Sequence, residues 1–522
     1  MLPILMMWDI MSQAIQYGCK TMILSKSDYM LFLRHPAWLW LKKFDKGKLP
    51  PADANLQAMF DAGHAFEWYA EQLFPEAVKL GFDGYPEYLS LPNRTQAALQ
   101  VGAKTILQGR FEADDLTCIV DVLTESAQGV FDLVEIKAST KAKPEHEYDL
   151  AFQVLVLEKC GLSIRSVSVM HANKEYVRQG EVVPAELITT TDVTDAVRAL
   201  TNTTLLRVDM AQNSLAQKTM PDLSPRYVNQ LGIPGVSSQW LAEWLTIFTT
   251  LKPQPDPYSI YNLSYPSPKQ LGELEDLGIT SIAEVPDELA LRPKQAAQIH
   301  TTKTNQRLLE PEKIREFLAG FTYPLYFFDY ETLSSIIPPF DGLSPYQDYP
   351  FQYSLHVIKK PGGEVKHLEY LHSEKTNPMP ELLSRLQQDI GDTGTILTWN
   401  MSYEKGCNDR MAALYPKYAG FLAQLNARVQ DLMTPFSEMW LFDKDFFGSA
   451  SLKKVLPVLA PELSYKELAV SDGLLARRLW TETILEDKHS EKRTAILSDL
   501  SQYCTLDTYA MDRIWEKLLL IL

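Results

Sequence analysis

The sequence predicts a mixed α/β protein in which a helical connector joins two α/β domains. Residues 22–205 and residues 319–522 each alternate short apolar strand patterns with amphipathic helix patterns. In residues 206–318 the strand signal fades, and residues 251–269 are rich in proline. A chain of 522 residues also exceeds the usual size of one hydrophobic core. We therefore expect at least two folded domains.

Composition narrows the class of protein. An apolar content of 46% is ordinary for a folded soluble chain, and no apolar run reaches the roughly 18 residues of a membrane span, so we expect no membrane association. The net charge of -16 gives no sign of a general basic face for nucleic acid. It does not exclude such a face, because clustered carboxylates that hold divalent cations also make a chain acidic. The five cysteines form no Cys-x-x-Cys pair, which argues against a disulfide framework or zinc ribbon and indicates the reducing cytoplasm.

The first domain is expected to follow a short tail. Residues 1–21 begin with MLPILMMWDIMSQ, which lacks the basic region of a signal peptide and contains Asp9, so we do not interpret them as a signal peptide. Met22, just before ILSKSD, is a candidate natural start, which would make residues 1–21 a poorly ordered tail. Ser25 and Asp28 are good N-cap residues ahead of an aromatic-rich helix that Pro36 interrupts. The chain then shows the elements of a mixed α/β domain: a helix near residues 59–74, strands over 117–124 and 130–139 joined by the turn ESAQG, a helix over 149–161 and a strand over 166–173.

In the connector, residues 271–300 predict two short helices around a Gly-Ile turn. They resemble a helix-hairpin-helix, an element that often holds a nucleic-acid backbone. The usual Gly-x-Gly hairpin is absent, so a plain helical spacer is the alternative.

The second domain opens on a strand that carries two acids. The pattern YPLYFFDYET spans residues 323–332, and Asp329 and Glu331 share a face because strand side chains alternate with period 2. Two like charges placed together indicate either a solvated strand end or a cation between them.

Further acids follow on later elements of this domain. The strand GTILTWN ends at Asn400, and the helix after it carries Glu404 in its first turn. In the last predicted helix, Tyr503 and Asp507 lie at i and i+4 on one face. Two divalent cations about 3.5–4 Å apart need such a carboxylate cluster to clamp the attacking and leaving oxygens of a phosphodiester.

The segments DYE, NMSYE and YCTLD, in this order and on these elements, resemble the motifs of the DEDDy branch of RNase H-like 3′–5′ exonucleases. The resemblance covers most of residues 319–522. It implies that two Mg²⁺ or Mn²⁺ ions are held by four carboxylates and that Tyr503 orients the attacking water; the carboxylates are Asp329, Glu331, Glu404 and Asp507.

The middle motif departs from this family, whose members usually have Asp where this chain has Glu404. The extra methylene moves the carboxylate by more than a bond length, so weaker activity or an altered metal preference is expected. Asp431 matches an acid after the next strand of these folds and is interpreted as a supporting or structural residue, with Asn400 as a further auxiliary residue.

The first domain carries a second candidate site. Asp121 lies among valines in a strand, where a buried carboxylate is costly unless a cation meets it. Across the hairpin, Glu135 and Lys137 share one face of the next strand. This arrangement resembles PD-(D/E)XK nucleases, in which the acids hold metal and the lysine orients water or offsets phosphorane charge. The resemblance implies one or two Mg²⁺ or Mn²⁺ ions if the site is active; a Glu–Lys pair in an inactive remnant of the fold is the alternative.

Other residues extend this resemblance to RecB-type nucleases. Glu67 would supply the upstream acid, and Gln153 stands where RecB-type members carry a glutamine. Many of those relatives use a cysteine near the start, with three later ones, to hold an iron–sulfur cluster. The position here is His35 and no later cysteine triplet exists, so we expect no iron–sulfur cluster.

The whole arrangement resembles a bacterial family described as a domain of unknown function. It implies a RecB-like PD-(D/E)XK (restriction-endonuclease-like) domain in residues 22–205, a helical connector in 206–318 and an RNase H-like DEDDy exonuclease domain in 319–522. We expect a cytoplasmic, metal-dependent nuclease that degrades DNA or RNA with a single-stranded end from its 3′ terminus; the sequence identifies no protein partner. Two alternatives remain: a catalytically weak nucleic-acid-binding scaffold in repair or defence, and a small-nucleotide phosphodiesterase.

Overall fold

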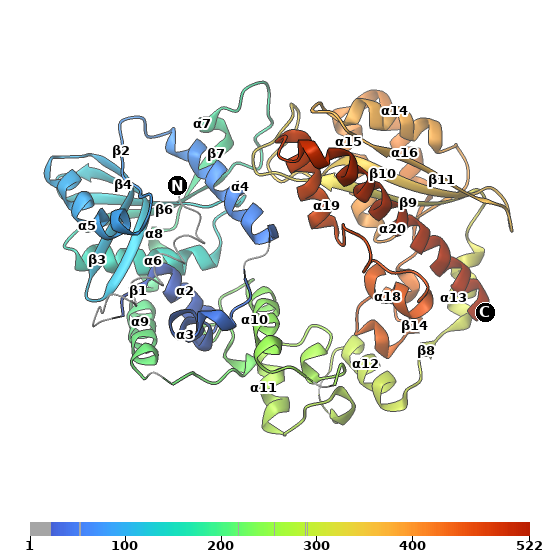
Figure 1. Ribbon diagram of the computed structural model, residues 1–522, viewed down its shortest axis with the longest axis horizontal. Coiled ribbons are helices and arrows are strands. Elements are labelled where there is room, and N and C mark those ends of the chain that lie inside the picture. Colours follow the sequence, from blue (N-terminus) through green and yellow to red (C-terminus); the bar gives the residue numbers. More distant parts are fainter. Residues whose placement is uncertain (1–21, 52–53, 218, 255, 288, 290) are drawn as a thin grey trace. The chain divides into compact units, whose positions relative to one another are not determined.

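The computed structural model describes residues 22–51, 54–217, 219–254, 256–287, 289 and 291–522 (Figure 1). The tail expected for residues 1–21 lies outside the described residues. Contacts within the chain divide it into two compact units. Unit 1 consists of Met1–Pro255, Tyr265–Asp276 and Ser335–Pro345, and unit 2 consists of Asp256–Ser264, Leu277–Ser334 and Tyr346–Leu522.

The expected connector is therefore shared between the two units. Of the two helices in the helix-hairpin-helix-like segment, α11 (Pro268–Asp276) belongs to unit 1 and α12 (Pro293–Thr304) belongs to unit 2. Each helix packs into the unit that contains it, because each has its own apolar face to bury.

Unit 1 is a mixed α/β unit. Its strands are β1 (Leu24–Ser25), β2 (Val78–Lys79), β3 (Thr105–Ala113), β4 (Leu116–Ala127), β5 (Val130–Ile136), β6 (Ser163–Ala172) and β7 (Ile188–Asp192). Its helices besides α11 are α2 (Lys26–Arg34), α3 (Pro36–Phe44), α4 (Ala54–Glu71), α5 (Tyr85–Gln100), α6 (Pro144–Lys159), α7 (Pro184–Leu187), α8 (Thr194–Ala199), α9 (Thr201–Ala216) and α10 (Ser237–Leu251).

The sheet of unit 1 has the order β2-β3-β4-β5-β6-β7, and β1 pairs with β4 in addition. Strands β3, β4 and β5 are antiparallel neighbours, whereas β5 and β6 are parallel. A parallel pair needs a crossover connection, and α6 supplies it. The register pairs Val122 of β4 with Val134 of β5, so Asp121 and Glu135 occupy the next positions along the two strands.

The break between α2 and α3 is built around His35, which is fully buried. Its ring stacks on Trp244 of α10 with ring centroids 3.7 Å apart. The Ala37 N–H donates to Nδ1 of His35 over 3.1 Å, so Nε2 carries the proton and donates to the Ser224 carbonyl oxygen at 3.0 Å. A neutral imidazole thus links the start of unit 1 to a segment nearly 200 residues later.

This contact predicts a pH-dependent stability. Burial lowers the pKa of His35 to about 4, whereas an unfolded histidine titrates near 6.5. Because the folded-state pKa is the lower one, the contribution is complete above about pH 6.5 and is lost as the pH falls toward 4. Between pH 7.5 and pH 5, His35 should account for about 2 kcal/mol of lost unfolding free energy. Urea unfolding of the wild type and of His35→Gln, which does not titrate, measures the difference; equal pH dependence would contradict it.

Unit 2 is also a mixed α/β unit. Its strands are β8 (Leu308–Leu309), β9 (Leu325–Leu333), β10 (Tyr349–Ile358), β11 (Val365–Leu371), β12 (Thr395–Thr398), β13 (Val429–Asp431) and β14 (Leu441–Phe442). Its α-helices besides α12 are α13 (Pro311–Ala319), α14 (Met379–Asp389), α15 (Met401–Leu414), α16 (Ala419–Arg428), α17 (Thr434–Ser437), α18 (Leu452–Leu459), α19 (Gly473–Trp480) and α20 (Arg493–Ile521).

The main sheet of unit 2 has the order β11-β10-β9-β12-β13. Strand β10 is antiparallel to both β11 and β9, whereas β12 is parallel to both β9 and β13. The carboxyl ends of β9, β12 and β13 therefore meet at one edge of the sheet. A separate two-stranded sheet pairs β14 with β8.

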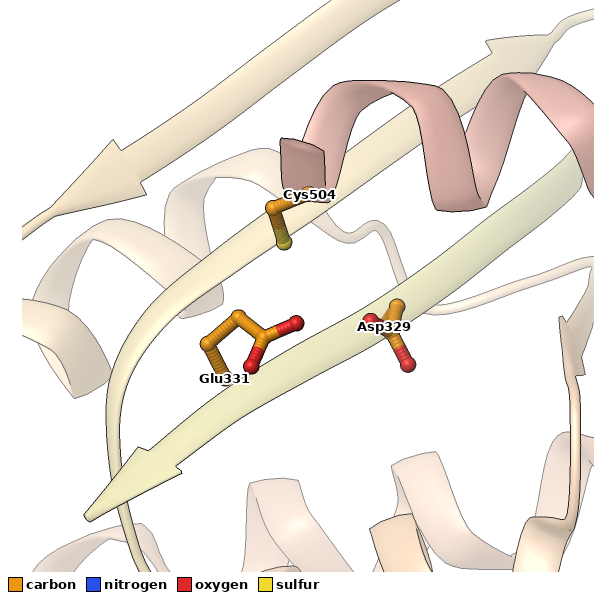
Figure 2. A group of neighbouring side chains, drawn as sticks. All are labelled: Asp329, Glu331 and Cys504. Carbon is orange, nitrogen blue, oxygen red and sulfur yellow. The ribbon is translucent and has the colours of Figure 1, made fainter. Parts of the chain in front are cut away.

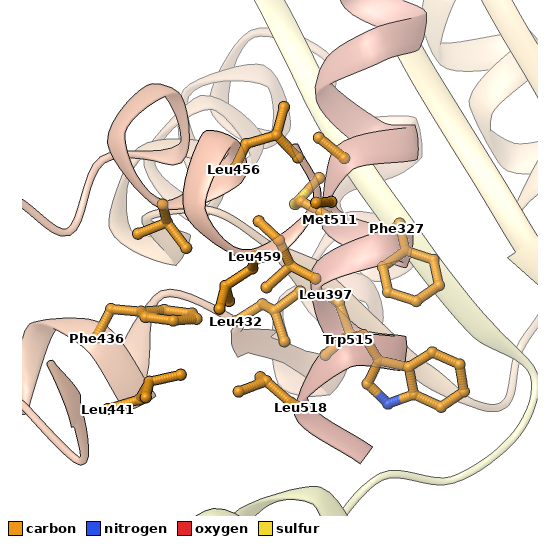
Figure 3. Packing of buried hydrophobic residues seen from close by; sticks show 14 of the residues in the cluster. Phe327, Leu397, Leu432, Phe436, Leu441, Leu456, Leu459, Met511, Trp515 and Leu518 are labelled. Atoms are coloured by element: carbon orange, nitrogen blue, oxygen red, sulfur yellow. The ribbon is translucent and has the colours of Figure 1, made fainter. Parts of the chain in front are cut away.

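Helices cover both faces of this sheet, because β9 is apolar on each side. Phe327 faces Trp515 of α20 with ring centroids 5.9 Å apart, and both belong to a core to which β9, α13, α18 and α20 contribute side chains. Figure 3 shows members of this core from β9, α18 and α20. Tyr330, which points the opposite way, donates its hydroxyl to Asn408 of α15 over 2.9 Å. Asp329 and Glu331 lie two and four residues after Phe327, so they project from the same face of β9 toward α20.

Two further findings concern the expectations from composition. Among the residues that the structure describes, no helix combines the length and the apolar character that a bilayer span requires. The four cysteines in this part of the chain, Cys118, Cys160, Cys407 and Cys504, are free thiols.

Candidate active site

A pocket of about 330 Å³ in unit 2 is lined by the acids that the sequence singles out. These residues come from β9, α15 and α20, elements that are far apart in the sequence. The lining includes Asp329, Glu331, Asn400, Glu404, Tyr503 and Asp507. Asp431 is not part of this lining.

The turn between β12 and α15 fixes the position of Glu404. Asn400 adopts a left-handed backbone conformation with φ 79°, which an asparagine tolerates better than most residues. The carboxylate of Asp431, at the end of β13, accepts the N–H groups of Asn400 at 3.0 Å and Met401 at 3.2 Å. It also accepts the N–H of Met433 at 3.0 Å. Asp431 therefore holds the turn that aims the first residues of α15 at the pocket.

Glu404 is almost completely buried, with 2% of its surface exposed. Its Oε2 atom has no hydrogen-bond partner among the described residues. Burial, and then the charge of Asp329, raise the pKa of this carboxyl well above its ordinary value. This oxygen is buried, has no hydrogen-bond partner among the described residues and belongs to a residue that lines a pocket of other acids. A positively charged ligand would stabilise it there.

Asp507 is held by two tyrosines. The hydroxyl of Tyr465 donates to its Oδ1 atom over 2.5 Å, and the hydroxyl of Tyr503 also donates to this carboxylate. Burial raises the pKa of Asp507 to about 6, although these hydrogen bonds and the charge of Lys453 act in the opposite direction. The rings of Tyr465 and Tyr503 lie with centroids 6.1 Å apart.

Mutual repulsion dominates the electrostatics of the pocket. Burial raises the pKa of Asp329 well above its ordinary value, and the charge of Asp507 raises it further. The pKa of Glu331 is raised in the same way, by burial and then by the charges of Asp329 and Asp507. A divalent cation would convert this repulsion into attraction. Because carboxylate oxygens are the ligands that Mg²⁺ and Mn²⁺ prefer, the donor set fits the ions that the resemblance implies.

Cys504 is a neighbour of the acids that sequence reasoning missed. Its sulfur and one oxygen each from Asp329 and Glu331 all lie within 4.8 Å of one another. Figure 2 shows Cys504 reaching from α20 toward the two acids of β9. Cys504 stands next to Tyr503 in the sequence. Its position in the helix does not predict that it lies near the acids, because that depends on which strand α20 crosses.

Three more residues at the pocket were not predicted. Lys453 and Arg477 line it, and Tyr465 holds Asp507. Lys453 is the second residue of α18, and Arg477 lies in α19. Tyr465 lies in an irregular segment between these two helices. No periodic pattern relates them to the acids, so only the folded chain brings them together.

In unit 1 the structure gathers the second set of predicted residues. The Ile136 N–H donates to Asp121 over 2.7 Å, and Lys137 Nζ lies 2.6 Å from Glu135 Oε1. Gln153 donates to Glu135 Oε2 over 2.7 Å. Glu67 is hydrogen-bonded by Gln108, and its pKa is raised to about 8 by burial and by the charge of Asp121.

Two unpredicted residues complete this unit 1 cluster. Lys26 Nζ lies 2.8 Å from Glu135 Oε1, and Asp149 lies 2.9 Å from Lys137 Nζ. Burial opposes the charge of Lys26, but Asp149 and Glu135 outweigh it and raise its pKa. Asp121 has no such cation bonded to it, and burial and the charge of Glu135 raise its pKa to about 7. The cluster therefore combines a glutamate that is paired with two lysines and two acids, Asp121 and Glu67, that form no ion pair among the described residues.

Comparison with known proteins adds one family match. A family model described as a domain of unknown function, DUF2779, matches residues 326–451. This range contains Asp329, Glu331 and Glu404, and it ends before Asp507. A search of curated proteins finds no match to the chain. The resemblance to a family described as a domain of unknown function is thereby confirmed for residues 326–451.

Proposed function

We propose that unit 2 is a metal-dependent nuclease that hydrolyses the phosphodiester bonds of DNA or RNA from the 3′ end. The observation that carries the proposal is the convergence of four carboxyl groups, three of them buried and that of Asp329 partly buried, with Tyr503 in one pocket. The four groups are contributed by three elements that the chain reaches at widely separated points. Such a cluster has a large electrostatic cost unless cations occupy it.

The order of strands supports an RNase H-like fold for unit 2. Counting β9 as the first strand, the sheet has the order third, second, first, fourth, fifth. The first three strands are antiparallel and the last two are parallel to the first. The acids lie on the first strand, at the start of the helix after the fourth strand, and on the last helix, as in the DEDDy branch that the motifs resemble.

The residues have separate roles in this proposal. Asp329, Glu331, Glu404 and Asp507 would hold two Mg²⁺ or Mn²⁺ ions, which when bound stabilise the charge that develops on the attacking and leaving oxygens. Asp431 and Asn400 position Glu404 through the turn before α15. The Tyr503 hydroxyl, which lies beside Asp507 in the pocket lining, would orient the attacking water.

The test uses single-stranded DNA and RNA labelled at the 3′ or the 5′ end, incubated with Mg²⁺ or Mn²⁺. The proposal expects a ladder of 5′-labelled products that shortens with time and an early release of the 3′ label. Binding without cleavage would instead support a nucleic-acid-binding scaffold. Cleavage of dinucleotides but not of long strands would support a small-nucleotide phosphodiesterase.

Unit 1 carries a second candidate site of the PD-(D/E)XK type. The chain order α4-β2-α5-β3-β4-β5-α6-β6, with Asp121 and Glu135 on neighbouring strands, supports this kind of fold. The observation that favours a metal there is the pair of neighbouring acids, Asp121 and Glu67, which form no ion pair among the described residues and whose pKa values are raised. If the ion pairs of Lys26 and Lys137 with Glu135 have replaced a metal instead, unit 1 is an inactive remnant.

A prediction separates the two units. Lys137→Ala should leave 3′-end degradation within about twofold of the wild type, because Lys137 forms its ion pairs with Glu135 and Asp149 of unit 1. The measurement is the rate of shortening of a 5′-labelled single strand. A loss as large as that expected for the acids of unit 2 would show that the chemistry belongs to unit 1. Direct binding of Mn²⁺ by Asp121→Ala, compared with the wild type, tests the metal site of unit 1 independently.

A further inference from the structure

Two cationic side chains line the pocket of unit 2, and they differ in what they contact. Arg477 is engaged: its Nε donates to the Thr332 carbonyl oxygen over 2.9 Å, and its Nη2 lies 3.4 Å from Asp348. Lys453 forms no ion pair with any carboxylate in the described part of the chain. Its ammonium group lies over the rings of Tyr503, at 5.2 Å from the centroid, and Tyr465, at 5.5 Å.

We propose that Lys453 binds the backbone phosphate of the nucleic acid at the bond that is cleaved. This inference rests on the proposed nuclease function of unit 2 and adds the residue that recognises the substrate's anionic group. Lys453 lines the same pocket as the four acids, which is the space that a bound phosphodiester would enter. The chemical class is the phosphodiester itself, which DNA and RNA share.

The tyrosine rings explain how the ammonium keeps its donors available. A cation above an aromatic face is attracted by the ring quadrupole but donates no conventional hydrogen bond to it. An ammonium has three N–H donors, and ring contacts leave them free for oxygen acceptors. The same two tyrosines donate their hydroxyls to Asp507, so the contact also fixes Lys453 beside one of the metal-binding acids.

The charge balance of the pocket makes this role physically reasonable. In the absence of metal, Lys453 moderates the repulsion among the acids, since its charge lowers the pKa of Asp329, Glu331 and Asp507. Once divalent cations neutralise the carboxylates, the charge of Lys453 remains uncompensated by the protein. An anionic phosphodiester oxygen would match this charge, and charge-assisted hydrogen bonds of this kind are stronger than those between neutral groups.

The chain offers a matched control in the adjacent residue. Lys454 is also on α18 but is exposed, its ammonium lies over Phe447 at 5.2 Å, and it does not line the pocket. Lys453→Met and Lys454→Met remove the same charge at neighbouring positions. Lys453→Arg keeps the charge and should restore most of the lost binding.

The experiment measures equilibrium binding by fluorescence anisotropy, with every variant made in the otherwise unchanged chain and with Ca²⁺ in place of Mg²⁺ or Mn²⁺ to limit cleavage. Two probes are used in DNA and RNA form: a labelled single strand, and the same strand with a neutral methylphosphonate in place of its last internucleotide phosphate. In the protein that keeps Lys453, the strand with the neutral linkage should bind roughly tenfold more weakly than the unmodified strand, because one charge-assisted hydrogen bond is lost. In Lys453→Met the two strands should bind equally, whereas Lys454→Met should keep the tenfold difference.

The salt dependence gives a second readout that a merely structural role would not change. Loss of one phosphate contact should reduce the slope of log affinity against log salt by about 0.7 for a single strand. If Lys453→Met retains both the tenfold difference and the salt slope, the role of Lys453 is overturned. The proposed function still stands in that case if the wild type degrades the strands. If the wild type neither binds nor cleaves any of these strands, both are overturned.

Discussion

Replacing Asp329 with alanine should reduce degradation from the 3′ end by several orders of magnitude. Asp329 lies at the centre of the acid cluster, where it raises the pKa of both Glu331 and Glu404 through its charge. A ligand in this position would contact the cations that offset the charge on the reacting oxygens, and such electrostatic stabilisation is usually the largest single contribution to catalysis. A thousandfold loss of rate corresponds to about 4 kcal/mol of barrier.

The same substitution should leave the fold intact. Burial already disfavours the charged form of Asp329, so removing the carboxylate relieves repulsion in the metal-free protein. Asp329→Asn keeps the size of the side chain, and thermal unfolding in EDTA should show it at least as stable as the wild type. Circular dichroism of the alanine variant checks that the sheet of unit 2 is retained.

Activity and metal binding are then compared in the same preparations. The expected result is loss of both 3′-end degradation and Mn²⁺ affinity in Asp329→Ala, with both retained in Lys137→Ala. Wild-type rates in Asp329→Ala, combined with a normal circular dichroism spectrum, would remove the two-metal site of unit 2 from consideration. Normal metal affinity with lost activity would place Asp329 outside the metal shell.

Local periodicity accounts for what the sequence predicted at this site. Asp329 and Glu331 could be assigned to one face because a strand repeats every two residues. Tyr503 and Asp507 could be assigned to one face because they are separated by one helical turn within α20. Glu404 could be placed in the first turn of a helix because the apolar strand pattern ends just before it. Each assignment needs only a few neighbouring residues.

The residues that the sequence did not predict depend on contacts between distant segments. Lys26 meets Glu135 from 109 positions away, and Tyr465 meets Asp507 from 42 positions away. Strand β3 was also not predicted, because Gln108, Arg110 and Glu112 interrupt its apolar pattern. Arg110 is nevertheless buried, since it donates to the Tyr88 carbonyl oxygen over 2.7 Å and to Thr117 over 3.1 Å. A buried arginine is tolerable only where such acceptors are in place, and these come from the fold.

Tyr503→Phe is expected to slow 3′-end degradation on the order of ten- to a thousandfold, about 1.4–4 kcal/mol of barrier. The loss should be smaller than for Asp329→Ala because the hydroxyl positions a water and carries no charge. The structure supplies an internal comparison, since Tyr465 donates to the same carboxylate of Asp507. Tyr465→Phe removes an equivalent hydrogen bond to that acid, but Tyr465 is not part of the pocket lining whereas Tyr503 is.

The pair of variants distinguishes two roles for Tyr503. If its hydroxyl only holds Asp507, the two substitutions should have similar effects, both on the rate and on the affinity for Mn²⁺. If it also orients the attacking water, Tyr503→Phe should lower kcat well beyond Tyr465→Phe while the two variants bind Mn²⁺ alike. We expect the second result, with Tyr465→Phe within about tenfold of the wild type, the scale of one lost hydrogen bond to a charged group. Single-turnover rates at saturating Mn²⁺ make the comparison, because they separate the chemical step from metal binding and product release.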